Sequence, residues 1–176
     1  KGILEEGQCE IGTHCHPWNT PPFDAHAPIR KQDTMLCNLP EPVVLDKLTM
    51  LHETICRNFG VTPVSFRAGR WGFGPVVARA LCLLGYRVDS SVMPYSDWRP
   101  NFGPDYSEFG PALFRFDAEG IHCPSEHGRL LEVPVTVSFS QGNFSLGHKI
   151  CRLLDNDIAK KFRLKGVLAS LCLVNK

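Results

Sequence analysis

The stretch "VSFRAGRWGFGPVVARALCLLGYRV", Val64 to Val88, decides the fold class. Val64 to Phe66 is typical of a short strand, and Pro75 then opens a segment whose apolar residues recur at helical spacing until Gly85. Tyr86 to Val88 predicts the next strand. A strand, a helix and a second strand in this order indicate parallel strands joined by a helical crossover.

The preceding residues extend the same alternation. Apolar side chains keep helical spacing from Val43 to Phe59, with Pro42 suited to the first turn and Gly60 to the end. A short strand is expected over Cys9 to Thr13. The order predicts an α/β sheet or barrel, in which ligands gather where the strands end. We therefore expect four polar residues on one rim: His14, His16, Arg67 and Asp89.

The pattern is looser after Ser90. The segment "MPYSDWRPNFGPDYSEFGP" is rich in Pro, Gly and aromatic residues and is interpreted as a long functional or covering loop. Further strands are expected over residues 112–116 and 130–137, then a helix over about 146–162 and a last strand in "GVLASLCLV".

Composition limits the possible functions. The chain has 176 residues, 43% of them hydrophobic, which favours a single domain with a sizeable core. The net charge of +1 comes from scattered charges, so nucleic-acid binding is not expected. The sequence shows no membrane span and no signal peptide. None of its 8 cysteines forms a Cys-x-x-Cys pair, so we expect free thiols and a cytoplasmic location.

The segment "EIGTHCHPWNTPPFDAH", Glu10 to His26, holds three of the seven histidines. In extended backbone His14 and His16 fall on the same side, because side chains alternate with period two. Two neutral imidazoles can bind one Zn²⁺ at about 2.0–2.1 Å each. A pair of loop histidines bonded to the backbone is the alternative. On these residues alone both interpretations stay open.

Arginine, aromatic and acidic residues supply the other candidates. Arg67, in "SFRAGRWGFGP", can hold a carboxylate by two parallel hydrogen bonds, while the glycines allow backbone to approach a ligand closely. A tight turn with solvated arginines is the alternative. Asp97 is a further carboxylate, and Trp71 and Trp98 are either sugar-stacking surfaces or core.

The segments "EIGTHCHPW", "FRAGRWGFGP" and "GYRVDSSVMPYSDW", in this order, resemble the polysaccharide deacetylase family, the NodB-homology domains. "HPWNTPP", "NLP" and "LGYRVDSSV" are similar to a branch associated with bacterial glycan biosynthesis. The resemblance implies a distorted (β/α) barrel and a divalent metal, usually zinc, held by one Asp and two His. His14 matches the first metal His, and His16, or else His26, the second. Arg67 matches the Arg that holds the base Asp, and Asp97-Trp98 resembles a pair on the site wall.

The family's Asp-Asp motif should precede "EIGTH" by several tens of residues, whereas only nine residues of the chain precede it. We therefore expect residues 1–176 to be one truncated domain with an incomplete (β/α) barrel. The resemblance predicts a metal-dependent carbohydrate deacetylase acting on an amino sugar or polysaccharide. It does not predict activity for this fragment alone. Two alternatives are a non-catalytic glycan-binding or assembly subunit, and a hydrolase of a non-sugar amide. Substrate identity and oligomeric state are not predicted.

Overall fold

The chain divides into two compact units, Lys1–Thr136 and Val137–Lys176. The computed structural model describes Gly2, Glu6, Gly7, residues 9–23 and 29–137, Lys149 and Leu153. Nearly all of the described residues belong to the first unit. The helix predicted over 146–162 and the strand predicted in "GVLASLCLV" lie outside the described residues, apart from Lys149 and Leu153.

A five-stranded sheet forms the centre of the first unit, in the order β1-β2-β3-β5-β4. Strand β1 pairs in parallel with β2, β2 with β3, and β3 with β5. Strand β4 pairs antiparallel with β5. The sheet is open, with β1 and β4 at its edges in the described part of the chain. Its strands are β1 (Thr13–Cys15), β2 (Ser65–Ala68), β3 (Val88–Asp89), β4 (Phe114–Phe116) and β5 (Leu130–Glu132).

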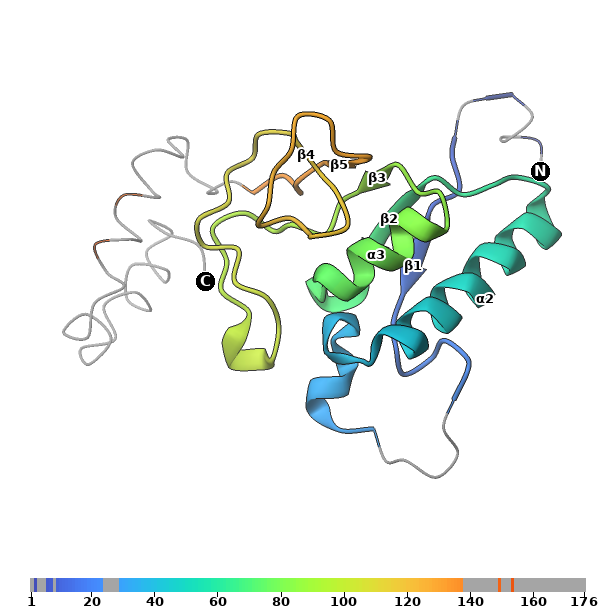
Figure 1. The fold of residues 1–176 in the computed structure, drawn as a ribbon, viewed down its shortest axis with the longest axis horizontal. Coiled ribbons are helices and arrows are strands. Elements are labelled where there is room, and N and C mark those ends of the chain that lie inside the picture. The colour runs from blue at the N-terminus through green and yellow to red at the C-terminus, as the bar shows by residue number, and fades with distance from the viewer. Residues whose placement is uncertain are drawn as a thin grey trace. The chain divides into compact units, whose positions relative to one another are not determined.

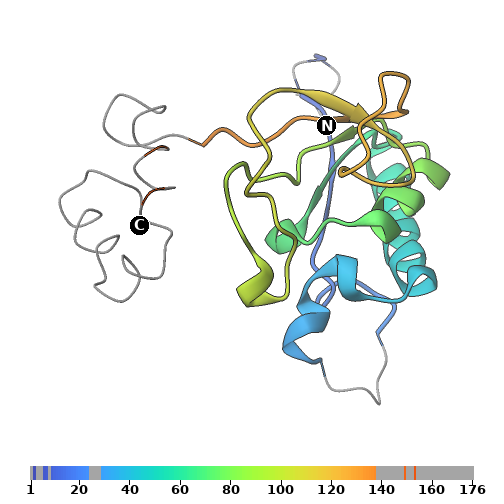
Figure 2. The same ribbon diagram turned by 60° about the vertical axis from the view of Figure 1, so that its left-hand side comes forward.

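Two α-helices cover one face of this sheet and pack against each other (Figures 1 and 2). Helix α2 (Glu41–Phe59) begins with Pro42 in its first turn and ends at Gly60, whose φ of 71° is left-handed. Helix α3 (Pro75–Leu83) begins with its own proline. The described residues also form four short 3₁₀ turns: η1 (Lys31–Thr34), η2 (Leu36–Asn38), η3 (Gly69–Trp71) and η4 (Arg99–Asn101).

The hydrophobic core lies between the helices and the sheet. Val44 and Leu48 of α2 and Val77 and Leu81 of α3 are fully buried there. Alternate strand residues point into it, so in β1 Thr13 and Cys15 are buried while His14 is exposed. The same alternation in β2 buries Phe66 and Ala68 and leaves Arg67 exposed. Polar side chains therefore line the face that the helices do not cover.

The predicted α/β class is confirmed, together with both helices and the parallel strands. The closed barrel is not formed by the described strands. The first strand lies over Thr13–Cys15 rather than Cys9 to Thr13, because Thr13 is the first residue to pair with β2. The expectation for Asp89 was wrong. It lies within β3 opposite Phe66, so its side chain enters the buried face instead of the rim.

Candidate functional site

His14 lies in β1 directly beside Arg67 of β2 in the parallel register. Its Nδ1 is 2.8 Å from the Arg67 carbonyl oxygen. A carbonyl only accepts hydrogen bonds, so Nδ1 carries the hydrogen and the neutral ring keeps a lone pair on Nε2. A histidine that binds a metal is commonly held in this way, with its other nitrogen donating to a carbonyl or carboxylate.

His16 follows one residue after the end of β1 and meets His14 edge to face. The two Nε2 atoms are 2.9 Å apart, and the ring centroids are 4.5 Å apart. Because His14 Nε2 carries no hydrogen, His16 Nε2 donates to it in the absence of a ligand. The buried Nδ1 of His16 then has no partner among the described residues. Burial, followed by the charges of His14 and Arg70, lowers the pKa of His16 and favours the neutral ring.

Gly69 makes room for the His16 ring. A Cβ atom at this position would lie 2.3 Å from His16 Nδ1 and 2.6 Å from the Cys15 carbonyl oxygen. Both distances are far below van der Waals contact, so a larger residue would displace the imidazole. The glycine expected to admit a ligand instead admits the chain's own histidine.

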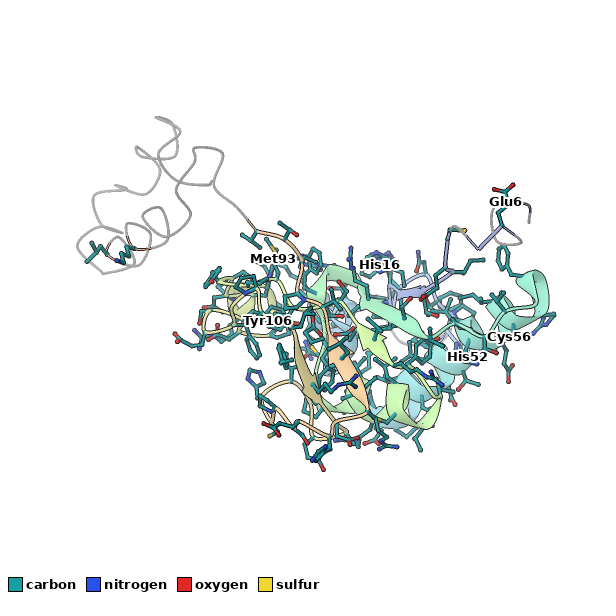
Figure 3. The ribbon with its side chains drawn as sticks, turned by 90° about the horizontal axis from the view of Figure 1, so that it is seen from above. Glu6, His16, His52, Cys56, Met93 and Tyr106 are labelled. Carbon is teal, nitrogen blue, oxygen red and sulfur yellow. The ribbon has the colours of Figure 1, made fainter. Side chains whose placement is uncertain are left out.

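Lys47 of α2 holds the loop that follows His16. Lys47 Nζ donates to the carbonyl oxygens of Thr20 and Pro22, each at 2.6 Å. The residue is only 5% exposed, and burial lowers its pKa. On the outer side of the loop, the Trp18 ring lies 4.3 Å from the His16 ring, centroid to centroid. His16 is therefore held by contacts on several sides. Figure 3 shows it with the surrounding side chains as sticks.

Arg67 reaches from β2 to the residue that follows β3. Its Nε donates to the Ser90 carbonyl and its Nη2 to the Ser90 hydroxyl, both at 3.0 Å. Its guanidinium carbon lies 5.8 Å from the centre of the Trp71 ring. His14, Arg67 and Ser90 line an open groove of about 460 Å³. The groove has no acidic lining residue; its other lining residues are Gly12, Thr13, Ser65, Phe66 and Val88.

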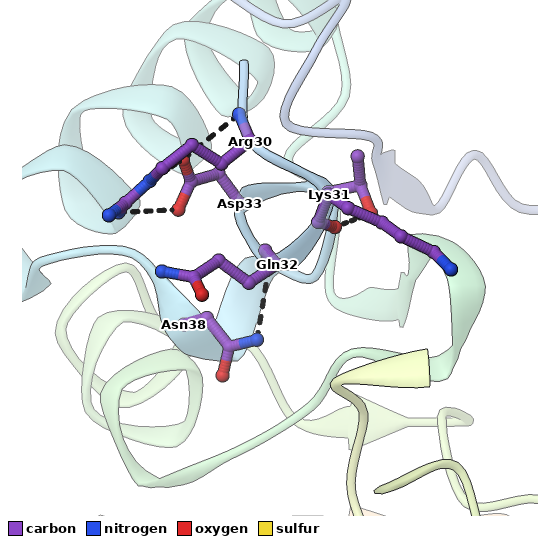
Figure 4. Close-up of polar contacts among 6 residues, drawn as sticks. Arg30, Lys31, Gln32, Asp33 and Asn38 are labelled. Carbon is purple, nitrogen blue, oxygen red and sulfur yellow. Dashed lines mark hydrogen bonds and ion pairs between the residues drawn. The ribbon is translucent and has the colours of Figure 1, made fainter. Parts of the chain in front are cut away.

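The turn after Arg67 is braced by the segment Arg30–Asn38. An Arg70 Nη1 donates to the Thr34 hydroxyl, and Cys37 N–H donates to the Gly72 carbonyl at 2.9 Å. Within the brace, Arg30 pairs with Asp33, and Figure 4 shows this pair and the Asn38–Gln32 contact. Arg70 and Trp71 have left-handed φ values of 54° and 61°. Such strain costs of order 1–3 kcal/mol per residue and persists only where surrounding contacts enforce it.

The two predicted sugar-stacking residues are both half-buried against the core. The Trp71 carbonyl accepts a hydrogen bond from the Tyr106 hydroxyl at 2.6 Å. Trp98 Nε1 donates to the Ser96 hydroxyl at 3.0 Å. The ring of Trp71 lies beside Arg67, but neither Trp71 nor Trp98 lines the groove.

Asp97 lies in the loop before η4 and is held by Arg99. Arg99 donates to its carboxylate from Nε, Nη2 and the backbone amide, each at 2.9 Å. These hydrogen bonds lower the pKa of Asp97, so the carboxylate stays ionised. Asp97 does not line the groove that holds His14 and Arg67.

The described residues therefore bring together His14, His16, Arg67 and Trp71. His26, the alternative second ligand, lies outside the described residues. In the part of the chain that is described, no three His, Cys, Asp or Glu side chains form a group that could hold a metal ion. Sequence reasoning missed Lys47, because a lysine inside an amphipathic helix normally indicates a solvated face.

Comparison with known proteins yields one structural likeness. No family model matches the sequence, and no curated protein matches it. The chain is similar to the crystal structure of a Mycobacterium smegmatis protein provisionally described as a polysaccharide deacetylase, with 23% identity and a TM-score of 0.41. The match covers 57% of this chain and 28% of that chain. This chain thus corresponds to little more than a quarter of the other protein's length.

The six described cysteines are all free thiols. Among the described residues, no helix has both the length and the apolar character needed to cross a membrane.

Proposed function

We propose that this chain carries part of the active site of a metal-dependent hydrolase that removes acetyl groups from an amino sugar or polysaccharide. His14 and His16 would supply two ligands through Nε2 to a divalent metal, with Zn²⁺ the best match to imidazole nitrogen. Arg67 and Asp97 are the proposed catalytic residues, and Trp71 and Trp98 the proposed sugar contacts.

One observation supports the proposal above all others. The two Nε2 atoms converge, and His14 is fixed by the Arg67 carbonyl in the tautomer that places its lone pair on Nε2. The donor set fits a zinc ion in kind, although two imidazoles are fewer than the three protein ligands of a catalytic zinc site. The remaining ligands would come from residues outside the described ranges or from solvent. A bound divalent metal lowers the pKa of its water and polarises a carbonyl oxygen.

The chain's own residues would orient the substrate. Ser90 uses two of the five N–H donors of the Arg67 guanidinium. Its other donors can bind a carboxylate or an acyl oxygen in the groove. This contact becomes stronger when negative charge develops on that oxygen, which is how such donors accelerate acyl transfer. The ring of Trp71, beside Arg67, offers an apolar face to a sugar ring.

Metal binding provides the direct test. We expect the purified chain to bind Zn²⁺ in calorimetry, and we expect zinc binding to quench or shift the fluorescence of Trp18, whose ring lies against that of His16. His14→Ala and His16→Ala should each weaken binding at least tenfold. His127→Ala, a change of an exposed histidine elsewhere on the unit, should leave binding unchanged. Equal zinc affinity in all four proteins would remove the proposed metal site.

Hydrolysis then separates the competing functions. Release of acetate from an N-acetylated amino-sugar oligomer, lost with chelator and restored by Zn²⁺, is the expected result. Cleavage of a non-sugar amide instead would favour a hydrolase of other amides. Oligosaccharide binding that is unaffected by chelator, with no hydrolysis, would favour a non-catalytic glycan-binding subunit.

A further inference from the structure

Two acidic side chains are buried side by side within the sheet. Asp89 of β3 and Glu132 of β5 are directly opposite in the parallel register, and each is 0% exposed. Both point into the helix-covered face, away from the groove that holds His14. Neither takes part in the ion pairs of the described residues. Two neighbouring carboxylates that are both ionised inside a core, with no cation, are strongly unfavourable, so one of the pair is expected to hold a proton.

The hydrogen bonds around the pair favour a proton on Glu132. Asp89 Oδ1 accepts from the Ser91 hydroxyl at 2.7 Å, and its Oδ2 accepts from the Ser91 amide at 3.2 Å. Glu132 Oε1 accepts from the Val92 amide at 2.9 Å. Glu132 Oε2 is buried and receives no hydrogen from any described residue. A proton on Glu132 satisfies the pair, because the acid can then donate to the ionised Asp89.

The surroundings of the pair are consistent with this assignment. Burial and then the negative charge of Asp89 raise the pKa of Glu132. Burial also raises the pKa of Asp89, opposed by hydrogen bonds from Glu132 and Ser91. The other titratable group facing the pair is Tyr106, with Cys37 beyond it. Burial raises the pKa of both, so both are neutral near pH 7, and among the described residues no cation balances a second negative charge.

The pair is connected to the groove through the turn after β3. The Ser91 hydroxyl that donates to Asp89 also accepts from the Ala68 amide at 2.8 Å. The neighbouring residue, Ser90, accepts both hydrogen bonds from the Arg67 side chain. Arg67 and Ala68 are consecutive residues of β2. The position of the Arg67 guanidinium therefore depends on a turn whose amides are held by two buried carboxyl groups.

We propose that Asp89 and Glu132 share one proton across the neutral pH range, and that the pair holds the 90–92 turn so that it positions Arg67. Both are positioning residues, since the groove lies on the other face of the sheet. The significance of Arg67 for catalysis rests on the proposed function. The shared proton and the held turn do not depend on the proposed function, because both can be measured without any substrate or metal.

Two near-isosteric variants test the proposal in opposite ways. Glu132→Gln keeps an amide donor for Asp89 and an acceptor for the Val92 amide, but has no proton to share. Asp89→Asn keeps the shape but presents an NH₂ group to one of the two Ser91 donors, so the turn loses one hydrogen bond. We expect Glu132→Gln to fold like the wild type and Asp89→Asn to unfold at lower urea concentration.

The pH dependence of unfolding reports the proton itself. The folded pKa of Glu132 is raised, so its stabilising effect is complete below the ordinary carboxyl pKa and is lost as pH rises towards the folded value. From about pH 5 to pH 8, the wild type should lose about a factor of ten in its folded-to-unfolded ratio per pH unit relative to Glu132→Gln. An infrared band from a protonated carboxyl group should also be present at pH 7 and absent in Glu132→Gln.

Exchange of the Arg67 Nε hydrogen, followed by NMR, tests the link to the groove. It should be slow in the wild type and in Glu132→Gln, and faster in Asp89→Asn. The shared proton would be overturned if the stability of the wild type and of Glu132→Gln changed equally with pH and the wild type lacked the infrared band. Equal exchange at Arg67 in all three proteins would overturn the positioning role. Loss of zinc binding by His14→Ala, or failure to bind zinc at all, bears on the proposed function and leaves both results intact.

Discussion

The histidine pair and the acid pair lie on opposite faces of the same sheet, and their surroundings differ in solvent and in charge. His14 is exposed and lies beside Arg67, whereas Asp89 and Glu132 are fully buried, and no described cation pairs with them. Water can solvate any protonation state of the exposed group. The buried pair must satisfy its charge and its hydrogen bonds internally, and a shared proton achieves this. Ligand chemistry is therefore expected on the exposed face, and structural support on the buried one.

The largest expected effect comes from removing one member of the acid pair. Asp89→Ala leaves the Ser91 amide, the Ser91 hydroxyl and the Glu132 proton without their acceptor. Each unsatisfied buried donor costs about 1–3 kcal/mol, so we expect a loss of about 3–5 kcal/mol in the free energy of unfolding. Urea denaturation at pH 7 measures it.

His14→Ala is the matched change on the exposed face. It should alter the free energy of unfolding by no more than about 0.5 kcal/mol, as is usual for surface positions. If His14→Ala and Asp89→Ala lowered the free energy of unfolding by similar amounts, the exposed face would support the fold as much as the buried face does.

An intermediate effect is expected for Lys47, the buried anchor of the His16 loop. Lys47→Met keeps the length of the side chain but removes the donor to the Thr20 and Pro22 carbonyls. Leaving these acceptors without a partner should cost about 1–3 kcal/mol. Zinc affinity should fall as well, because the loop that holds His16 loosens.

Lys31→Met provides the control, since Lys31 is an exposed lysine of η1. Its stability and zinc affinity should match those of the wild type. If Lys47→Met retained full zinc affinity while losing stability, the lysine would support the fold alone and not the histidine pair.

The smallest change in stability is expected for Asp97. Its exposed pair with Arg99 is screened by solvent, so Asp97→Asn should unfold almost as the wild type does. Asp117→Asn, which removes the comparable pair with Arg129, serves as its control. The proposed catalytic role predicts slower acetate release for Asp97→Asn only. Equal rates in both variants would exclude Asp97 from the site.

Much of the fold could be predicted from local patterns in the sequence. Helical spacing of apolar residues, with prolines at the first turns and Gly60 at an end, placed both helices within a few residues. Period-two alternation also correctly put His14 and His16 on one side of the chain, where their Nε2 atoms meet. These features depend on neighbours in sequence, which is why one sequence suffices to find them.

Other features depend on contacts between distant segments. The glycines after Arg67 looked suited to a ligand, but Gly69 makes room for His16 and Gly72 for the backbone of Leu36. The sequence pattern indicates a surface position for Lys47, but the loop after His16 covers its side chain. These contacts have no signal in the local sequence pattern, because each joins residues at least 25 positions apart.

The sequence by itself determined the α/β class, the order of helices and parallel strands, and the polar residues from which a site could be built. Only the tertiary structure decided which face of the sheet each residue occupies. Strand register sets that choice, and a shift of one residue would exchange the two faces. Register buried Asp89 opposite Glu132 and left His14 beside Arg67 in an open groove. The strand-end aspartate expected at the rim thus became half of a buried acid pair.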